Sequence, residues 1–230
     1  MADRRTRRRR PPDRAYTFRV DQDPSNELPL FELPVVLLPG ELMPLHIFEE
    51  RYKRMIGHCL ETEEPFGVVL RDDDGSARRI GCTARVTEVL ERFEDGRMDI
   101  VVTGEEPFKV LERFDGTDYP AGEVEAVPRS DDEEPSDPGA AEDARVTFAD
   151  LVRRVSGSEP EIEGLDDSDA YAIAARVELP VLTKQRLLEL RSEAERMKLL
   201  GEALHDLVRM LKRSREIAEA AKMNGRVTFS

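Results

Sequence analysis

The sequence has little cysteine and no long apolar run. Two cysteines, Cys59 and Cys82, occur in 230 residues, which are too few for a disulfide-stabilised scaffold and fit reduced thiols in the cytoplasm. No apolar stretch approaches the roughly 18 residues that a membrane-spanning helix needs. The N-terminus is basic but lacks the apolar stretch of a signal peptide. We therefore expect a cytoplasmic protein with no membrane segment.

Catalytic motifs are absent as well. The sequence contains neither a phosphate-binding G-x-x-x-x-G-K-[ST] loop nor a G-x-S-x-G nucleophile turn. Its three histidines, His46, His58 and His205, lie far along the chain from any serine in a nucleophile context. We therefore expect no catalytic residues, and we predict that the protein is not an enzyme.

Candidate metal ligands are few. A transition-metal site would have to draw on His46, His58, Cys59 and Cys82. Adjacent residues such as His58 and Cys59 project about 100° apart on a helix, so both cannot easily face one ion. The carboxylate run at residues 72–74 lacks the alternating ligands and the distal glutamate of a calcium-binding loop. We expect no metal and no cofactor.

Acidic residues dominate the charge. The chain has 35 Lys and Arg against 49 Asp and Glu, a formal net charge of −14, and such a surface repels phosphate backbones on average. Residues 1–14 are the exception, because they hold seven arginines. This segment cannot bury apolar surface and should be disordered. It is either a solvated tail or a segment that binds RNA, an anionic lipid surface or an acidic partner.

The first half of the chain predicts strands around a single helix. Apolar residues alternate from Leu28 to Leu33, Pro39-Gly40 marks a turn, and the chain is extended again from Leu42 to Phe48. From Glu49 the apolar period changes to that of a helix, whose buried stripe consists of Tyr52, Met55, Ile56 and Cys59.

Short segments rich in valine, isoleucine and phenylalanine follow this helix. The predicted strands are 66–71, 79–92, 97–104, 107–114 and 119–127, with Asp95-Gly96 and Asp115-Gly116 as hairpin signals. Pro107 should begin a strand or lie at an edge, since proline cannot donate to a ladder. Several antiparallel strands at this spacing predict a small barrel or a highly curved sheet over residues 15–128.

The second half predicts helices. Residues 129–143 are acidic, contain proline and have almost no large apolar side chains, so we expect a linker. We predict a helical bundle over residues 144–222 and a C-terminal tail over residues 223–230. We expect a helix over 144–155, a second capped by Ser168 or Asp169, and a long third helix capped by Thr183. In the third, Leu190, Met197, Leu204 and Leu211 recur every seven residues. This stripe is either a coiled-coil seam or, as we favour, a face packed in the bundle.

An ordered series of short motifs resembles the Lon N-terminal domain family, the substrate-binding domain of the ATP-dependent Lon protease. The series covers roughly Leu28 to Met210. Its members are 28–31, 38–40, 43–45, 47–49 with Arg51-Tyr52, 66–69, 80–86, 119–121, 179–181 and 184–189. Pro107 departs from the pattern, which usually has arginine there. The resemblance implies a PUA-like β-domain followed by helices, in a stand-alone form without the ATPase and peptidase domains.

We expect such a protein to bind polypeptide segments or partner proteins without catalysis. Candidate contact residues are Leu42, Met43 and Leu45, which lie beside Pro39-Gly40 and Pro44 on what we expect to be a proline-stiffened loop. The alternative is that these three are ordinary core residues. A second function would be RNA binding by the arginine-rich tail, because PUA-like folds bind RNA in other families. A third would be an adaptor whose long C-terminal helix docks on a partner.

Overall fold

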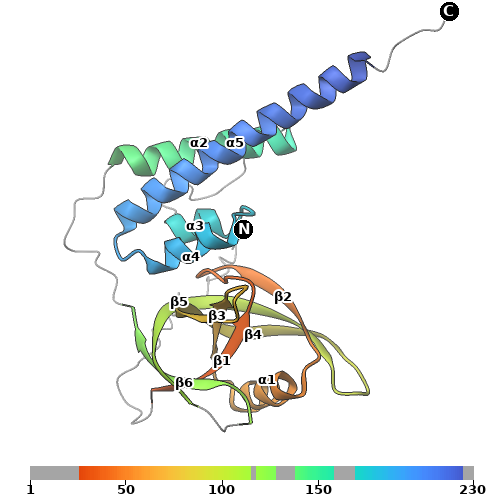
Figure 1. Ribbon diagram of the computed structural model, residues 1–230, viewed down its shortest axis with the longest axis vertical. Coiled ribbons are helices and arrows are strands. Elements are labelled where there is room, and N and C mark those ends of the chain that lie inside the picture. Colours follow the sequence, from red (N-terminus) through yellow and green to blue (C-terminus); the bar gives the residue numbers. More distant parts are fainter. Residues whose placement is uncertain (1–25, 115–117, 128–137, 158–168, 225–230) are drawn as a thin grey trace, which may run out of the picture.

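The computed structural model describes residues 26–114, 118–127, 138–157 and 169–224. The predicted N-terminal tail, the Asp115-Gly116 turn, most of the predicted linker and most of the C-terminal tail lie outside these ranges. A β-barrel forms one end of the molecule and a helical part the other, with a long helix projecting away from the body (Figure 1). The expected α+β fold is therefore confirmed.

Six strands form one sheet. They are β1 (Glu27–Leu33), β2 (Leu42–Ile47), β3 (Phe66–Arg71), β4 (Ala77–Arg92), β5 (Met98–Phe114) and β6 (Ala121–Ala126). The sheet has the order β2-β5-β4-β3-β1-β6, and β5 also pairs with β6, which closes the barrel. The expected antiparallel pairing holds except between β1 and β3, which are parallel. The parallel pair is possible because α1 (Glu50–Thr62) and β2 lie between these strands along the chain.

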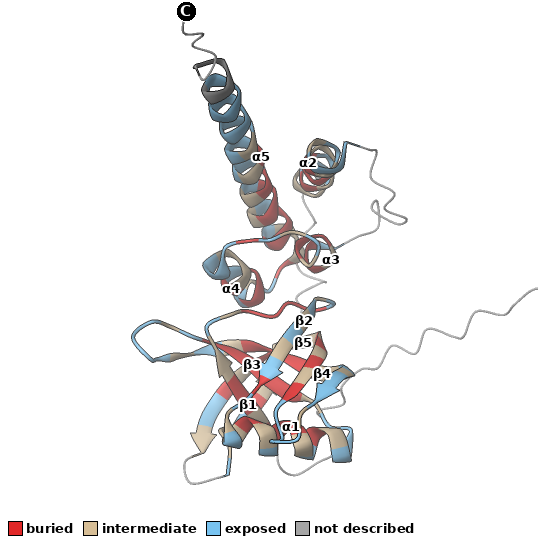
Figure 2. Cartoon of the chain, turned by 90° about the vertical axis from the view of Figure 1, so that its right-hand side faces the viewer, coloured by how far each residue is buried: buried red, intermediate tan, exposed pale blue. Residues whose placement is uncertain are grey.

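The helix α1 lies at the end of the barrel opposite the helical part (Figures 1 and 2). Its buried residues are the predicted stripe, Tyr52, Met55, Ile56 and Cys59. The ring of Tyr52 packs 4.2 Å from that of Phe31 on β1, centroid to centroid. The helix thus covers one end of the barrel core with the apolar face that the sequence predicted.

The strand break expected at Pro107 does not occur. Residues 98–114 form one strand, β5, and Pro107 pairs with Cys82 of β4 inside it. The β4–β5 register shifts between Cys82 and Ala84. At this bulge the Thr83 hydroxyl accepts a hydrogen bond from the Glu106 N–H at 3.0 Å and donates to the Glu106 carbonyl at 3.2 Å. Proline is tolerated because a bulge, rather than a regular ladder, surrounds it.

The helical part contains α2 (Pro138–Ser156), α3 (Ala170–Ala174), α4 (Val181–Glu189) and α5 (Glu193–Asn224). The short helices α3 and α4 lie between the barrel and the α2–α5 pair (Figures 1 and 2). The predicted Asp169 cap is confirmed, since its carboxylate accepts from the Ala172 N–H at 2.7 Å. The linker predicted over 129–143 was too long, because α2 begins at Pro138. Proline fits a first helical turn, where its missing N–H has no helical partner, and Ala144 is already buried.

The long helix predicted from Thr183 is in fact two helices. Pro180 caps α4, and Leu190 leaves the helical conformation with φ −77° and ψ 135°. The Arg196 guanidinium donates to the carbonyls of Leu190 and Arg191 at 2.9 and 3.2 Å. These bonds satisfy the carbonyls that the break exposes. Met197 and Leu204 of the seven-residue stripe are buried, so the bundle interpretation of that stripe is confirmed.

One large cluster of buried apolar residues runs through both halves of the molecule. It includes Phe31, Phe66 and Ile100 of the barrel together with Phe148 and Leu204 of the helices. A smaller cluster lies inside the barrel and consists of Leu28, Leu30, Val69, Phe108, Val110 and Val124. Figure 2 shows that burial fades along α5 towards its C-terminal end.

Candidate functional site

The strand β2 lies at an edge of the sheet. It pairs only with β5, from Leu42 opposite Thr103 to Ile47 opposite Met98. Its other edge has no strand partner within the described residues. An unpaired edge presents backbone N–H and C=O groups to any extended segment that approaches it. Pro44 removes one of these N–H groups, a common way of limiting uncontrolled pairing at an edge.

A tight turn holds the start of β2 in place. The Glu41 N–H donates to the Leu38 carbonyl at 3.0 Å, and Gly40 has a positive φ of 74°. This turn rests on Gly104 of β5 through two backbone hydrogen bonds, Gly40 N–H to Gly104 C=O at 2.8 Å and Gly104 N–H to Glu41 C=O at 3.0 Å. A Cβ atom on Gly104 would lie 2.1 Å from the Leu38 oxygen. Only glycine permits this approach.

The three predicted contact residues lie in one strand but face different ways. Leu42 is 65% exposed, whereas Met43 and Leu45 are half-buried and pack against the main core. This alternation is the two-residue period of a strand. Leu42 therefore presents its side chain to solvent, whereas Met43 and Leu45 contribute mainly backbone N–H and C=O groups to the edge of β2. The stretch is a strand and not a loop.

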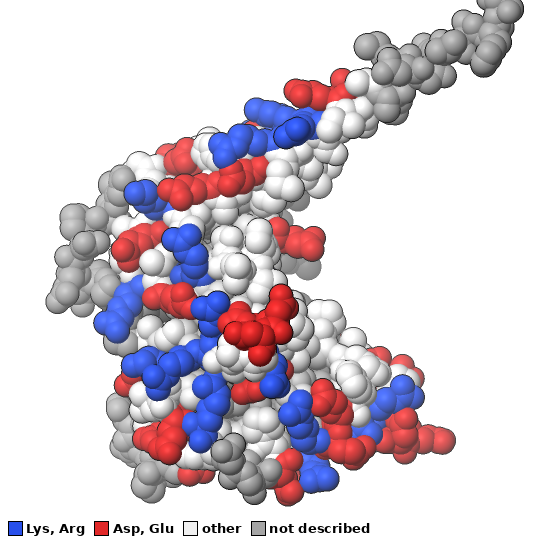
Figure 3. All heavy atoms as spheres, in the orientation of Figure 1, with Lys and Arg blue, Asp and Glu red and all other residues white. Residues whose placement is uncertain are grey.

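Further exposed apolar side chains flank β2, and the sequence analysis did not single them out. Phe48, directly after the strand, is 60% exposed, and Leu182 at the start of α4 is also 60% exposed. An ion pair between Lys184 of α4 and Glu41 fixes the first turn of α4 to the residue before Leu42. Figure 3 shows the molecule hollowed between the barrel and the helical arm, with mostly uncharged atoms over the position of β2. The start of α4 comes near Glu41 only through tertiary packing, so no pattern in the sequence singles out Leu182.

The distal end of β2 carries a polar and aromatic cluster. His46 Nδ1 and Asp99 Oδ1 are 2.5 Å apart, and both side chains are partly exposed. The His46 ring lies 5.9 Å from the Phe48 ring and 6.1 Å from the Phe93 ring, centroid to centroid. Stacking against the His46 ring holds Phe48 beside the strand.

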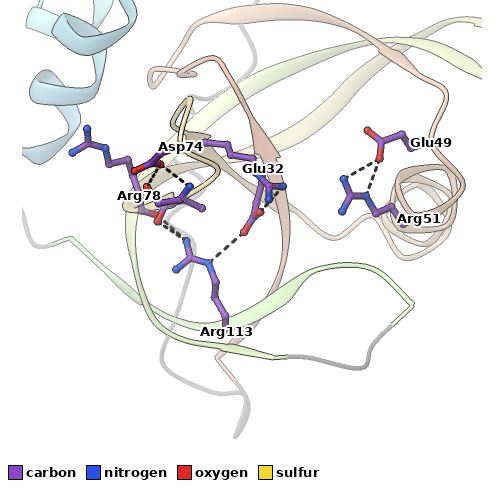
Figure 4. A network of polar contacts seen from close by, with 9 residues as sticks. Glu32, Glu49, Arg51, Asp74, Arg78 and Arg113 are labelled. Carbon is purple, nitrogen blue, oxygen red and sulfur yellow. Dashed lines mark hydrogen bonds and ion pairs between the residues drawn. The ribbon is translucent and has the colours of Figure 1, made fainter.

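A larger polar network lies on the barrel away from β2 (Figure 4). The Glu32 carboxylate, only 13% exposed, lies 3.4 Å from the Arg71 guanidinium and 3.3 Å from that of Arg113. Arg113 also donates to the carbonyls of Ala77 and Arg78. Each of these charges has a partner, so the network stabilises strand contacts rather than presenting a reactive group.

The thiols are buried and poorly ionised. Burial raises the pKa of Cys59 to about 11, and it raises the pKa of Cys82 further. Neither residue forms a disulfide. Across the described ranges no three His, Cys, Asp or Glu side chains are grouped to hold a metal ion. No described helix is long and apolar enough to cross a membrane.

Comparison with known proteins identifies relatives of this fold and sequence. Residues 27–206 match the family model for the substrate-binding domain of ATP-dependent protease La (LON). The Lon protease of Anaeromyxobacter dehalogenans is 31% identical over 204 residues, which are 81% of this chain and 24% of that protein. Lon protease 2 of Myxococcus xanthus is 29% identical over 204 residues, which are again 81% of this chain and 24% of that protein. The chain thus spans about a quarter of the length of these curated relatives.

Solved structures agree with the sequence comparison. The Lon N-terminal domain protein from Xanthomonas campestris superposes with a TM-score of 0.57 at 27% identity, over 76% of this chain and 96% of that one. The N-terminal domain of the Mycobacterium avium complex Lon protease has a TM-score of 0.64 at 20% identity, over 78% of this chain and 98% of that one. Because the Mycobacterium avium complex domain is only 20% identical to this chain, its similarity shows a shared fold alone.

Proposed function

This chain belongs to the LON substrate-binding domain family, and from that membership we propose that it binds extended, apolar polypeptide segments along strand β2. The single observation that supports this location is that one edge of β2, beside exposed Leu42, has no strand partner in the part of the chain that the structure describes. The match covers the substrate-binding domain and neither the ATPase nor the peptidase domain of Lon. Binding without catalysis is therefore the role that we assign to residues 27–206.

Binding would use strand addition. A polypeptide in extended conformation can hydrogen-bond to the free backbone groups of β2, and its alternate side chains can contact apolar surface nearby. Leu42 and Phe48 offer such surface at the two ends of the strand. Leu182 is exposed on α4 two residues before Lys184, which pairs with Glu41. Met43 and Leu45 contribute backbone groups, because their side chains pack against the core.

The interaction should be weak and largely independent of salt. The strand has only six residues, and Pro44 lacks one donor, so the contact area is small. A small interface leaves little free energy after the cost of association, and we expect a Kd on the order of micromolar or poorer. Apolar contact and backbone hydrogen bonds are not screened by ions, so raising the salt from about 0.05 to 0.5 M should barely change the Kd.

Leu42→Asp tests the proposal. The side chain is mostly solvent-exposed, so a carboxylate there should leave the Tm nearly unchanged while weakening binding at least about tenfold, since it places a charge in an apolar contact. Binding is measured by fluorescence anisotropy with a reduced and carboxymethylated protein as the unfolded probe. Val146→Asp is the matched control, because Val146 is 56% exposed on α2, away from the barrel.

The outcomes separate the site from the function. Loss of binding in Leu42→Asp alone supports the β2 site. Equal binding by both variants and the unchanged protein removes β2 from the proposal, and no binding by the unchanged protein at about 100 µM contradicts polypeptide binding itself. Met43→Asp is a poor test, because its half-buried side chain packs against the core. The alternative of RNA binding by residues 1–14 concerns a segment outside the described ranges.

A further inference from the structure

The strands β6 and β2 lie end to end along one edge of β5. Thr103 of β5 pairs with β4 on one side and with Leu42 of β2 on the other. Further along β5, Phe108 pairs with β4 and with Ala126 of β6. Because β4 follows one edge of β5 past both residues, β6 and β2 share the opposite edge. Both are antiparallel to β5, so the end of β6 points towards the start of β2.

The strand β1 lies against the other edge of β6 (Figure 1). Glu123 of β6, which pairs with β5, also pairs with Glu27 of β1. The two strands are antiparallel, so the chain enters β1 from the side of Ala126, where β2 begins. Asn26 keeps this course, because its carbonyl accepts a hydrogen bond from the Val124 N–H at 2.9 Å. Asn26 is therefore aimed along the line on which the free edge of β2 lies.

Residues 1–25 precede the part of the chain that the structure describes, and they are long enough to reach β2. Leu42 is level with Thr103 of β5. Glu27 is level with Glu112 of β5, nine positions further along. Phe18 precedes Glu27 by the same nine positions, which span about 30 Å in an extended chain. A chain that continues β1 backwards in line thus brings Phe18 level with Leu42, antiparallel to β2.

The residues that this reach places beside β2 have the sequence pattern of a strand. Tyr16, Phe18 and Val20 alternate with Thr17 and Arg19, and aromatic and β-branched residues are favoured in strands. The side chains of β2 alternate with the same period of two. A strand with this pattern can therefore place its apolar side chains beside the exposed apolar side chains of β2.

We propose that residues 16–20 pair antiparallel with the free edge of β2 and so occupy the polypeptide site of their own molecule. This inference rests on the proposed function, because it assigns a competitor to that site. The pairing is intramolecular, so even a strand of five residues competes at an effective concentration in the millimolar range. A polypeptide then binds only the molecules whose edge is free, and its apparent affinity is reduced by that fraction.

Two proline substitutions in the full chain test the pairing. One of any two neighbouring residues in a strand directs its N–H at the partner strand, so Thr17→Pro combined with Phe18→Pro removes a donor in either register. Hydrogen exchange of residues 42–47, measured by mass spectrometry, should become about three- to tenfold faster in this variant. Ala2→Pro combined with Thr6→Pro is the matched control, because it adds two prolines without changing the charge. The control should exchange like the unchanged protein.

Binding of the reduced and carboxymethylated probe gives the second readout. The Thr17→Pro, Phe18→Pro variant should bind it about three- to tenfold more tightly than the unchanged protein, and the control should bind it equally. Unchanged exchange of residues 42–47 in that variant would overturn the pairing, whatever the probe shows. Faster exchange with unchanged probe affinity would show that the segment and the probe do not compete, which overturns the shared site. Faster exchange with no probe binding by any of the three proteins would support the pairing and contradict polypeptide binding instead.

Discussion

At the scale of single residues, the environment of Cys59 has a measurable consequence. The side chain lies on the buried face of α1, and desolvation raises the pKa of its thiol to about 11. In the unfolded chain the thiol ionises near its ordinary value of about 9. Between these two values the unfolded state loses a proton that the folded state keeps. Ionisation therefore favours the unfolded chain as the pH rises, and the stabilising contribution is complete only below about pH 9.

We expect the free energy of unfolding to fall as the pH rises from 9 to 11, by on the order of 1 kcal/mol through Cys59. Urea denaturation at a series of pH values measures this. Cys59→Ala is the control, because it removes the thiol while Cys82 and the tyrosines still titrate. The difference in unfolding free energy between the two proteins should narrow with pH. If the unfolding free energies of the two proteins changed in parallel with pH, burial would not raise the pKa of the Cys59 thiol.

At the scale of elements, Glu41 joins the start of β2 to α4. One oxygen of its carboxylate accepts from the Leu38 N–H at 3.0 Å, and the other pairs with the Lys184 ammonium. Both side chains of the ion pair are only 13% exposed. The pair thus fixes the helical part against the turn that positions Leu42, and it lies beside the proposed binding strand.

Replacing one member of this ion pair should lower the free energy of unfolding more than replacing both members. Glu41→Gln keeps an acceptor for the Leu38 N–H but leaves the Lys184 ammonium poorly solvated and without its carboxylate partner. We therefore expect the free energy of unfolding to fall by about 2–4 kcal/mol. Combining it with Lys184→Met should recover part of that loss, because no unpaired charge remains. Urea denaturation of both single variants and the double variant measures the coupling. Strictly additive losses would show that the pair contributes no interaction energy.

The sequence predicted those elements whose signal is local. The α1 stripe follows from apolar spacing, and the Asp169 cap follows from residue type next to a helix start. The break between α4 and α5 was missed because it depends on Arg196, whose side chain reaches back to the carbonyl of Leu190, six residues earlier. The continuous β5 was missed because Thr83 of another strand bonds to Glu106 beside Pro107.

The candidate site was only partly predictable for the same reason. Period two indicated that Leu42 and Met43 face opposite ways, but not which of them faces the core. That depends on the register with β5, where Met43 lies opposite buried Val102. The role of Gly104 under the Leu38–Glu41 turn likewise depends on a contact between segments far apart in the chain.

At the scale of the whole molecule, the barrel and the helices share one core. The Gln185 side chain of α4 donates to the Ile80 carbonyl of β4 at 3.1 Å, and Gln185 is almost fully buried. The Tyr171 hydroxyl of α3 donates to the Leu187 carbonyl at 3.1 Å, which holds α3 against α4. The layer of α3 and α4 therefore lies between the barrel and α5, and one apolar cluster contains described residues from both halves.

We therefore expect the two halves to remain associated after the chain between them is cut. Residues 130–136 are acidic and contain proline but no core-forming side chain, so their replacement by a recognition site for a specific protease should leave the fold intact. After cleavage the two fragments should elute together from a size-exclusion column and separate only in denaturant, because the shared core keeps its buried area.

Thermal unfolding of the cut protein gives a second measurement. One cooperative transition is expected, at a lower Tm than for the intact protein, because cutting the chain raises the entropy of the unfolded state. The intact variant with the protease site is the control for the replaced residues. Fragments that elute separately without denaturant, or two independent transitions, would mean that the barrel and the helices fold as separate domains joined by a linker.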